Sequence, residues 1–189
     1  MLSEQKYSLV SRGDRFYVNP QDSVALLEKE KWISGRGTEF KNSGTTTRKI
    51  ENYLDETLSN SIEEIFNSIF EQYTKNGGEA HAYQIISEYE GQKKLSLKVT
   101  DDTVFYSFNP AREELEEIKY SQLPSSFDCF PIVNISSAWQ LPIKNVDTFG
   151  ITIACKELVV TPSTRKYSKR PREDKSVKIS SFFKLAKKD

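Results

Sequence analysis

The spacing of the apolar residues changes once along the chain, and this change limits the possible folds most strongly. From Ile50 to Tyr73, large apolar side chains recur at steps of three and four residues, which is the period of an amphipathic helix. Asn76–Gly78 then provides a helix stop, and the period becomes two, as in β-strands. Together the two patterns predict an α+β fold, with one long helix over residues 46–75 and a mainly antiparallel sheet that forms a small barrel or a sandwich.

Shorter elements are predicted from local signals on both sides of this helix. Alternating apolar residues predict strands at 7–18 (two strands), 80–90, 93–99, 103–109, 130–141 and 149–160. Cap residues or a leading proline predict short helices at 24–32 and 110–120. The glycines predict a loop over residues 33–49, which contains Gly35, Gly37 and Gly44. These elements make up one globular domain, residues 1–160.

The formal charge of the chain is zero, but it is unevenly divided. Residues 161–189 carry a net charge of +7, whereas residues 1–160 carry −7 and the interval 51–160 alone carries −10. Residues 161–175 have no apolar period and indicate a flexible, disordered basic linker, followed by a C-terminal peptide, residues 176–189. A basic tail of this kind serves polyanions or a transport receptor.

The C-terminal peptide places an apolar cluster in a basic context. Ile179 and Phe182 are three residues apart, so a single 3₁₀ turn would put them on one face, with Phe183 beside them. This spacing resembles the PIP box, the peptide by which replication and repair proteins bind the sliding clamp PCNA. Ser176 stands where that family has glutamine, which should weaken binding. The resemblance implies a cellular or viral sliding clamp as a partner. The alternatives are that the cluster docks on the protein's own domain or that it occurs by chance.

A second signal lies upstream of this peptide. The stretch R-K-Y-S-K-R-P-R resembles a nuclear import signal, whose basic residues are Arg165, Lys166, Lys169, Arg170 and Arg172. The same residues could contact phosphates directly. We therefore expect a protein of the nucleus or of a site of viral DNA replication.

Catalytic signals are weak, and the sequence favours a protein that is not an enzyme. The glycine-rich stretch lacks the G-K-[ST] of a phosphate-binding loop, and His81, without a nucleophile motif nearby, is typical of a structural histidine. Asp101 and Asp102 could hold the metal of a nuclease, but acidic residues between strands commonly form turns. Cys129 and Cys155 lie in apolar runs and are predicted to be buried free thiols. No cofactor, metal site or membrane span is expected.

Aromatic and basic residues alternate between Lys31 and Lys49. The predicted nucleic-acid-binding residues of this stretch are Trp32, Arg36, Phe40, Lys41, Arg48 and Lys49. Proteins that hold single strands without sequence preference combine such cations with aromatic faces on which bases stack. The alternative is an ordinary solvated loop whose two aromatic side chains pack into the core.

The second β-rich half offers a further set of candidates. P-I-V-N-I-S-S-A-W-Q-L followed by D-T-F-G-I-T-I-A-C-K resembles the closing strands of OB-like single-stranded DNA-binding proteins of large DNA viruses. The resemblance implies an OB-like domain. Trp139 and Phe149 flank a loop that contains Lys144, and the three could form a second stacking site or simply pack the end of a hairpin.

Three hypotheses follow. The first is a replication or repair accessory protein whose domain binds single-stranded DNA and whose tail recruits it to the sliding clamp. The second is an adaptor that links another protein to the clamp. The third is a metal-dependent nuclease acting through Asp101 and Asp102. A homo-oligomer is compatible with each of them.

Overall fold

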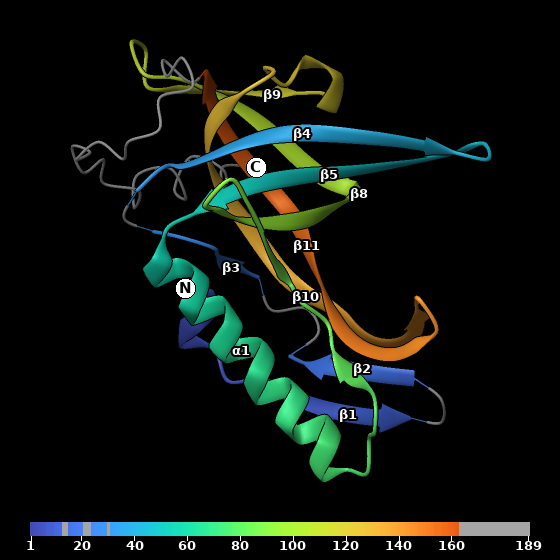
Figure 1. The fold of residues 1–189 in the computed structure, drawn as a ribbon. Helices are drawn as coiled ribbons and strands as arrows, with labels where there is room; N and C mark the ends of the chain where they lie inside the picture. The colour runs from blue at the N-terminus through green and yellow to red at the C-terminus, as the bar shows by residue number, and fades with distance from the viewer. Residues whose placement is uncertain (13–14, 21–23, 30, 163–189) are drawn as a thin grey trace.

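Most of the described chain is β-sheet, and one long helix packs beside it (Figure 1). The computed structural model describes residues 1–12, 15–20, 24–29 and 31–162. The strands are β1 (Ser8–Arg12), β2 (Arg15–Asn19), β3 (Ala25–Leu26), β4 (Ile33–Asn42), β5 (Thr45–Leu54), β6 (His81–Ala82), β7 (Ile86–Tyr89), β8 (Gln92–Asn109), β9 (Glu114–Ile118), β10 (Phe127–Ile143) and β11 (Val146–Pro162). The helix is α1 (Glu56–Lys75), and Leu2–Glu4 and Tyr120–Gln122 form 3₁₀ turns.

Five of the strands pair in a closed ring. The ring runs β4–β5–β8–β11–β10 and returns from β10 to β4. Every pairing in the described sheet is antiparallel except those of β11 with β8 and with β6. This confirms the prediction of a mainly antiparallel sheet with one long helix. The ring encloses large apolar side chains, and Ile50, Leu97, Phe127 and Leu158 are fully buried.

The helix covers part of this core with the apolar stripe that the sequence predicted. Of that stripe, Leu58, Ile62, Ile69 and Tyr73 are buried and Ile65 is partly buried; Phe66, outside the predicted stripe, is buried as well. The ring of Tyr73 stacks on Phe149 of β11 at 4.2 Å between centroids. Gln72 ties the helix to β1, because its amide oxygen accepts from Leu9 N (2.8 Å) and its amide nitrogen donates to the Tyr7 carbonyl (3.1 Å). No helix in the described ranges is both long and apolar enough to cross a membrane.

The predicted loop over residues 33–49 is wrong. Most of this stretch forms β4 and the first half of β5, a hairpin whose turn lies at Ser43 and Gly44, both with positive φ. Gly35 and Gly37 serve close packing instead of chain reversal. A Cβ on Gly35 would lie 3.0 Å from the Phe127 ring, and one on Gly37 would lie 3.1 Å from the Tyr120 hydroxyl.

The helix begins at Glu56, ten residues later than predicted. Ile50 and Leu54 belong to β5, where a spacing of four residues also places two side chains on one face. Asp55 is the N-cap: its backbone is extended and its Oδ1 accepts from Leu58 N at 2.8 Å. The spacing of Ile50 and Leu54 is compatible with a helix and with a strand, so it could not show where the helix begins. The N-cap Asp55 marks that position.

The short predicted helices are also wrong, and pairing partners explain both. Ala25–Leu26 pairs with β10, and Glu114–Ile118 adds to the edge of β8. Sheet pairing here overrides local helical propensity. Residues 92–109 form one long strand instead of two, and the single strand predicted at 80–90 is divided into β6 and β7. The strands predicted at 7–18, 130–141 and 149–160 are confirmed.

Both cysteines are free and buried, as predicted. Burial raises the pKa of Cys155 to about 12 and raises that of Cys129 as well. The two thiols therefore stay protonated at neutral pH and are poor nucleophiles.

The cap at Asp55 should make the stability of the domain depend on acid pH. Partial burial alone would raise the pKa of Asp55, but hydrogen bonds from Lys31 and from Leu58 N hold it below its ordinary value. A lowered pKa contributes stability that is present above the unfolded-state pKa of about 3.9 and lost as the pH falls through the folded value. We expect Asp55→Ala to cost about 1 kcal/mol at pH 7, measured by urea unfolding.

Asp55→Asn is the matched control, because asparagine caps a helix about as well but does not titrate. Its stability should fall less than that of the wild type as the pH falls below the unfolded-state pKa of about 3.9 and through the lowered folded-state pKa of Asp55. Equal pH dependence of the two proteins would contradict the assignment.

Candidate nucleic-acid interface

Two long hairpins extend toward the same side of the molecule in Figure 1, one formed by β4 and β5 and the other by β10 and β11. The β4–β5 hairpin turns at Ser43–Gly44. The β10–β11 hairpin turns at Lys144 and Asn145, whose φ values of 50° and 66° are those of a two-residue turn. Within the ring, β8 lies between β5 of the first hairpin and β11 of the second.

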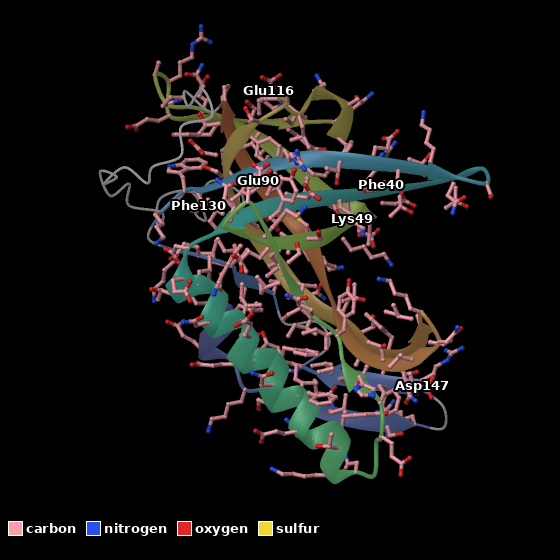
Figure 2. All side chains as sticks on the ribbon, in the orientation of Figure 1. Phe40, Lys49, Glu90, Glu116, Phe130 and Asp147 are labelled. Carbon is pink, nitrogen blue, oxygen red and sulfur yellow. The ribbon has the colours of Figure 1, made fainter. Side chains whose placement is uncertain are left out.

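Phe40 and Lys49 share one face of the β4–β5 hairpin. In the register, Thr38 lies opposite Lys49 and Phe40 opposite Thr47, and opposed or alternate residues point to the same side. The Lys49 ammonium lies 5.7 Å from the centroid of the Phe40 ring, which is 54% exposed. In Figure 2 both residues lie at the lower border of this hairpin, on the side of the β10–β11 hairpin. This face thus presents an open aromatic ring beside a cation.

The neighbouring strand adds a second cation to the same face. Lys98 of β8 lies opposite Lys49 of β5 and is exposed. Within the described part of the chain, neither of these lysines forms an ion pair, and nor does Lys144 at the other turn. These three positive charges are therefore not neutralised by carboxylates of the described residues.

The β10–β11 hairpin holds an aromatic pair that depends on a glycine. Trp139 lies directly over Gly150, where a Cβ would approach the indole to 2.3 Å. Tyr83 packs edge-on against Trp139 at 5.2 Å between centroids, and its backbone N–H donates to the Phe149 carbonyl at 2.8 Å. Tyr83 is 40% exposed. No local pattern indicated Tyr83, because only the parallel pairing of β6 with β11 brings it there.

Aliphatic residues continue this face to the tip of the hairpin. Ile143 lies opposite Val146, and Leu141, two residues before Ile143, is on the same side as Trp139. Their exposed fractions are 36%, 44% and 56% for Ile143, Val146 and Leu141. The tip is therefore an open apolar surface around Lys144.

Phe149 and Trp32 do not belong to an open surface. Phe149 is fully buried between α1 and the sheet, so its predicted role in binding is wrong. Trp32 is half-buried and packs on Phe130 at 4.2 Å and on Phe108 at 6.1 Å. For Trp32 the alternative of core packing describes the structure. The ring of Phe149 packs against Phe70 and Tyr73 of α1 and Phe16 of β2, contacts that local sequence does not reveal.

The predicted cations of residues 31–49 fall into two sets. Arg48 and Lys41 lie on the face opposite Phe40; both contact Glu39, and Arg48 also lies over the Tyr120 ring at 5.2 Å. Arg36 shares the face of Lys49 but donates its Nε to Glu51 at 2.7 Å. The structure therefore brings Phe40, Lys49 and Arg36 together and separates Arg48 and Lys41 from them.

Acidic residues gather elsewhere. Glu113, Glu114, Glu116 and Glu117 lie on or next to β9, and Figure 2 shows Glu116 across the β4–β5 hairpin from the β10–β11 hairpin. Asp101 and Asp102 are exposed on β8, and the described residues contain no group of three His, Cys, Asp or Glu that could hold a metal ion. His81 is exposed on β6.

The residues proposed for clamp binding and nuclear import lie outside the described residues. This applies to Ser176, Ile179, Phe182 and Phe183, and to the basic cluster of residues 165–172.

No family model and no curated protein matches the chain. Two solved structures have a loosely similar backbone. The single-stranded DNA-binding protein from bacteriophage Enc34 is 11% identical, with a TM-score of 0.47, over 95% of this chain and 99% of that one. The single-stranded DNA-binding protein gp2.5 encoded by bacteriophage T7 is 8% identical, with a TM-score of 0.46, over 78% of this chain and 91% of that one.

Gly150→Ala should displace Trp139, because the added methyl would overlap the indole ring. Overpacking of this kind typically costs about 1–3 kcal/mol. We expect lower stability in urea and greater acrylamide quenching of Trp139, measured in a Trp32→Phe background that leaves a single tryptophan. In a Trp139→Leu background the same glycine substitution should cost much less; an equal cost in both backgrounds would contradict this contact.

Proposed function

We propose that the domain is an OB-like barrel that binds single-stranded DNA without sequence preference. The observation that carries this proposal is the closed ring β4–β5–β8–β11–β10 together with what its hairpins present. In an OB-fold, oligonucleotides bind across the second and third strands and the loops that join strands one and two and strands four and five. Here those elements are β5 and β8 and the turns of the β4–β5 and β10–β11 hairpins. Lys49 lies on β5, Lys98 on β8 and Lys144 in the β10–β11 turn. Phe40 and Trp139 lie on β4 and β10, the strands that lead into the two turns, and Tyr83 packs on Trp139.

The mechanism is base stacking combined with phosphate neutralisation. Phe40 and the Tyr83–Trp139 pair supply ring faces or edges, and each base stack contributes about 1–3 kcal/mol. Lys49, Lys98 and Lys144 supply positive charge along the same face. If each displaces one counterion from a single strand, the slope of log affinity against log salt is about −2.

The first test is fluorescence anisotropy of labelled oligo-dT against the full chain. We expect Phe40→Ala to weaken binding about tenfold or more, because one stacking surface is lost. Val24→Ala is the matched control. Val24 is 52% exposed, close to the 54% of Phe40, but it lies next to β3 and outside both hairpins. That variant should bind like the wild type.

A salt series and a truncation to residues 1–162 complete this experiment. The truncation should retain binding and tryptophan quenching, with a shallower salt slope once the basic tail is removed. Binding that requires residues 163–189, or that is unchanged in Phe40→Ala, would contradict a stacking surface on the domain.

A protein-binding adaptor is the second candidate, and the exposed aliphatic tip favours it. Leu141, Ile143 and Val146 form an apolar strip of the kind that protein partners cover. If the full chain and the truncation both fail to bind oligo-dT, the adaptor hypothesis replaces the DNA-binding one.

Recruitment to a sliding clamp and nuclear localisation stay predictions from the tail sequence. Ile179, Phe182 and Phe183 support the first, and the basic cluster of residues 165–172 supports the second. We expect a peptide of residues 172–189 to bind PCNA weakly, measured by calorimetry, since Ser176 replaces the usual glutamine. The peptide with alanine at both phenylalanines should not bind, and equal binding of the two would contradict a PIP box.

A further inference from the structure

A carboxylate sits under two cations on the face proposed to bind DNA. Glu51 of β5 accepts from Arg36 Nε of β4 at 2.7 Å and from Lys94 Nζ of β8 at 3.1 Å. In the register, Arg36 lies opposite Glu51, two residues along from the Thr38–Lys49 pair. The three side chains therefore continue the face that carries Lys49 and Lys98.

The exposure of the three side chains is graded. The side chain of Glu51 is 9% exposed, whereas those of Lys94 and Arg36 are 21% and 41% exposed. An anion that approaches from solvent would meet the guanidinium and the ammonium before the carboxylate. The Lys94 ammonium has three N–H donors and gives one to Glu51, so a phosphate can bind it without separating it from Glu51.

Glu51 is ionised at neutral pH. Burial alone would raise the pKa of Glu51, but the hydrogen bonds and charges of Arg36 and Lys94 lower it below its ordinary value. The cluster thus carries a net charge of one positive unit instead of two. A phosphate bound there would be repelled by the carboxylate beneath it.

We propose that Arg36 and Lys94 form a binding subsite for one backbone phosphate of single-stranded DNA, and that Glu51 positions the two cations while limiting the affinity of the subsite. This inference rests on the proposed function. It extends the DNA-binding face from the two hairpins along β4, β5 and β8. It also implies that the charge of Glu51 lowers the affinity of this face for single-stranded DNA.

The test is Glu51→Gln, assayed with oligo-dT over a series of salt concentrations. Glutamine keeps the shape of the side chain and removes its charge. We expect binding about tenfold tighter at low salt and a salt slope steeper by about 0.7, the value for one more displaced counterion on a single strand. The reverse change, Arg36→Gln with Lys94→Gln, should weaken binding and flatten the slope.

Glu39→Gln is the matched control. It removes one negative charge from the same hairpin, but Glu39 pairs with Arg48 on the opposite face. Its affinity should change less than twofold. If Glu39→Gln tightens binding as much as Glu51→Gln, overall charge explains the effect and the subsite is overturned.

The outcomes separate this inference from the function on which it rests. If the wild type binds, Phe40→Ala weakens binding and the Arg36/Lys94 variant has no effect, then only the subsite is wrong. If neither wild type nor Glu51→Gln binds oligo-dT, both proposals fail. Circular dichroism melts establish that each variant is folded at the assay temperature; if Glu51→Gln does not fold, the Arg36/Lys94 variant decides the question.

Discussion

The pairing of β4 with β10 closes the ring of strands, and the relative position of the β4–β5 and β10–β11 hairpins depends on this short contact. Three residue pairs make the closure, joining residues 33–35 to residues 127–129. Gly35 permits it, because a Cβ there would lie 2.9 Å from the Asn52 amide and 3.0 Å from the Phe127 ring. At the same point the Cys129 thiol accepts from the Asn52 amide and donates to the Ile33 carbonyl, so one buried cysteine links three strands. A side chain at Gly35 would hold β4 away from β10 and open the ring.

Closure also explains why the two hairpins and the charged residues divide as they do. Once β4, β5, β8, β11 and β10 form a ring, the β4–β5 and β10–β11 hairpins extend beyond it toward one side, and their outward faces are continuous with that of β5 and β8 (Figure 1). The acidic strand β9 pairs with the far half of β8 and stays apart from this face. A domain with an acidic body can therefore offer a basic, aromatic surface, because the charges are separated in space although their sum is negative. Glu51 also lies on this face, where Arg36 and Lys94 compensate its charge.

Parts of this arrangement could be predicted because they depend on local period. The apolar stripe from Leu58 to Tyr73 and the long runs of β10 and β11 were readable for that reason. Phe40 and Lys49 could both be listed as candidates because aromatic and basic residues alternate in that stretch, but only the β4–β5 register brings the two together. The loop expected at residues 33–49 was wrong because Gly35 and Gly37 have the composition of a turn, while the rings of Phe127 and Tyr120 are the real reason for them. A glycine that avoids a distant side chain has no local signature.

The sequence by itself determined the α+β class, the division of charge between residues 1–160 and 161–189, and the types of residue available for binding, since each follows from composition or from neighbours along the chain. Only the tertiary structure decided which of those residues are open. It buried Phe149, covered Trp32, and placed Tyr83 against Trp139 and Lys98 beside Lys49. The physical reason is that exposure and cross-strand contact depend on strand pairing over long separations. The parallel pairing of β11 with β6 and β8 joins segments that no periodicity connects.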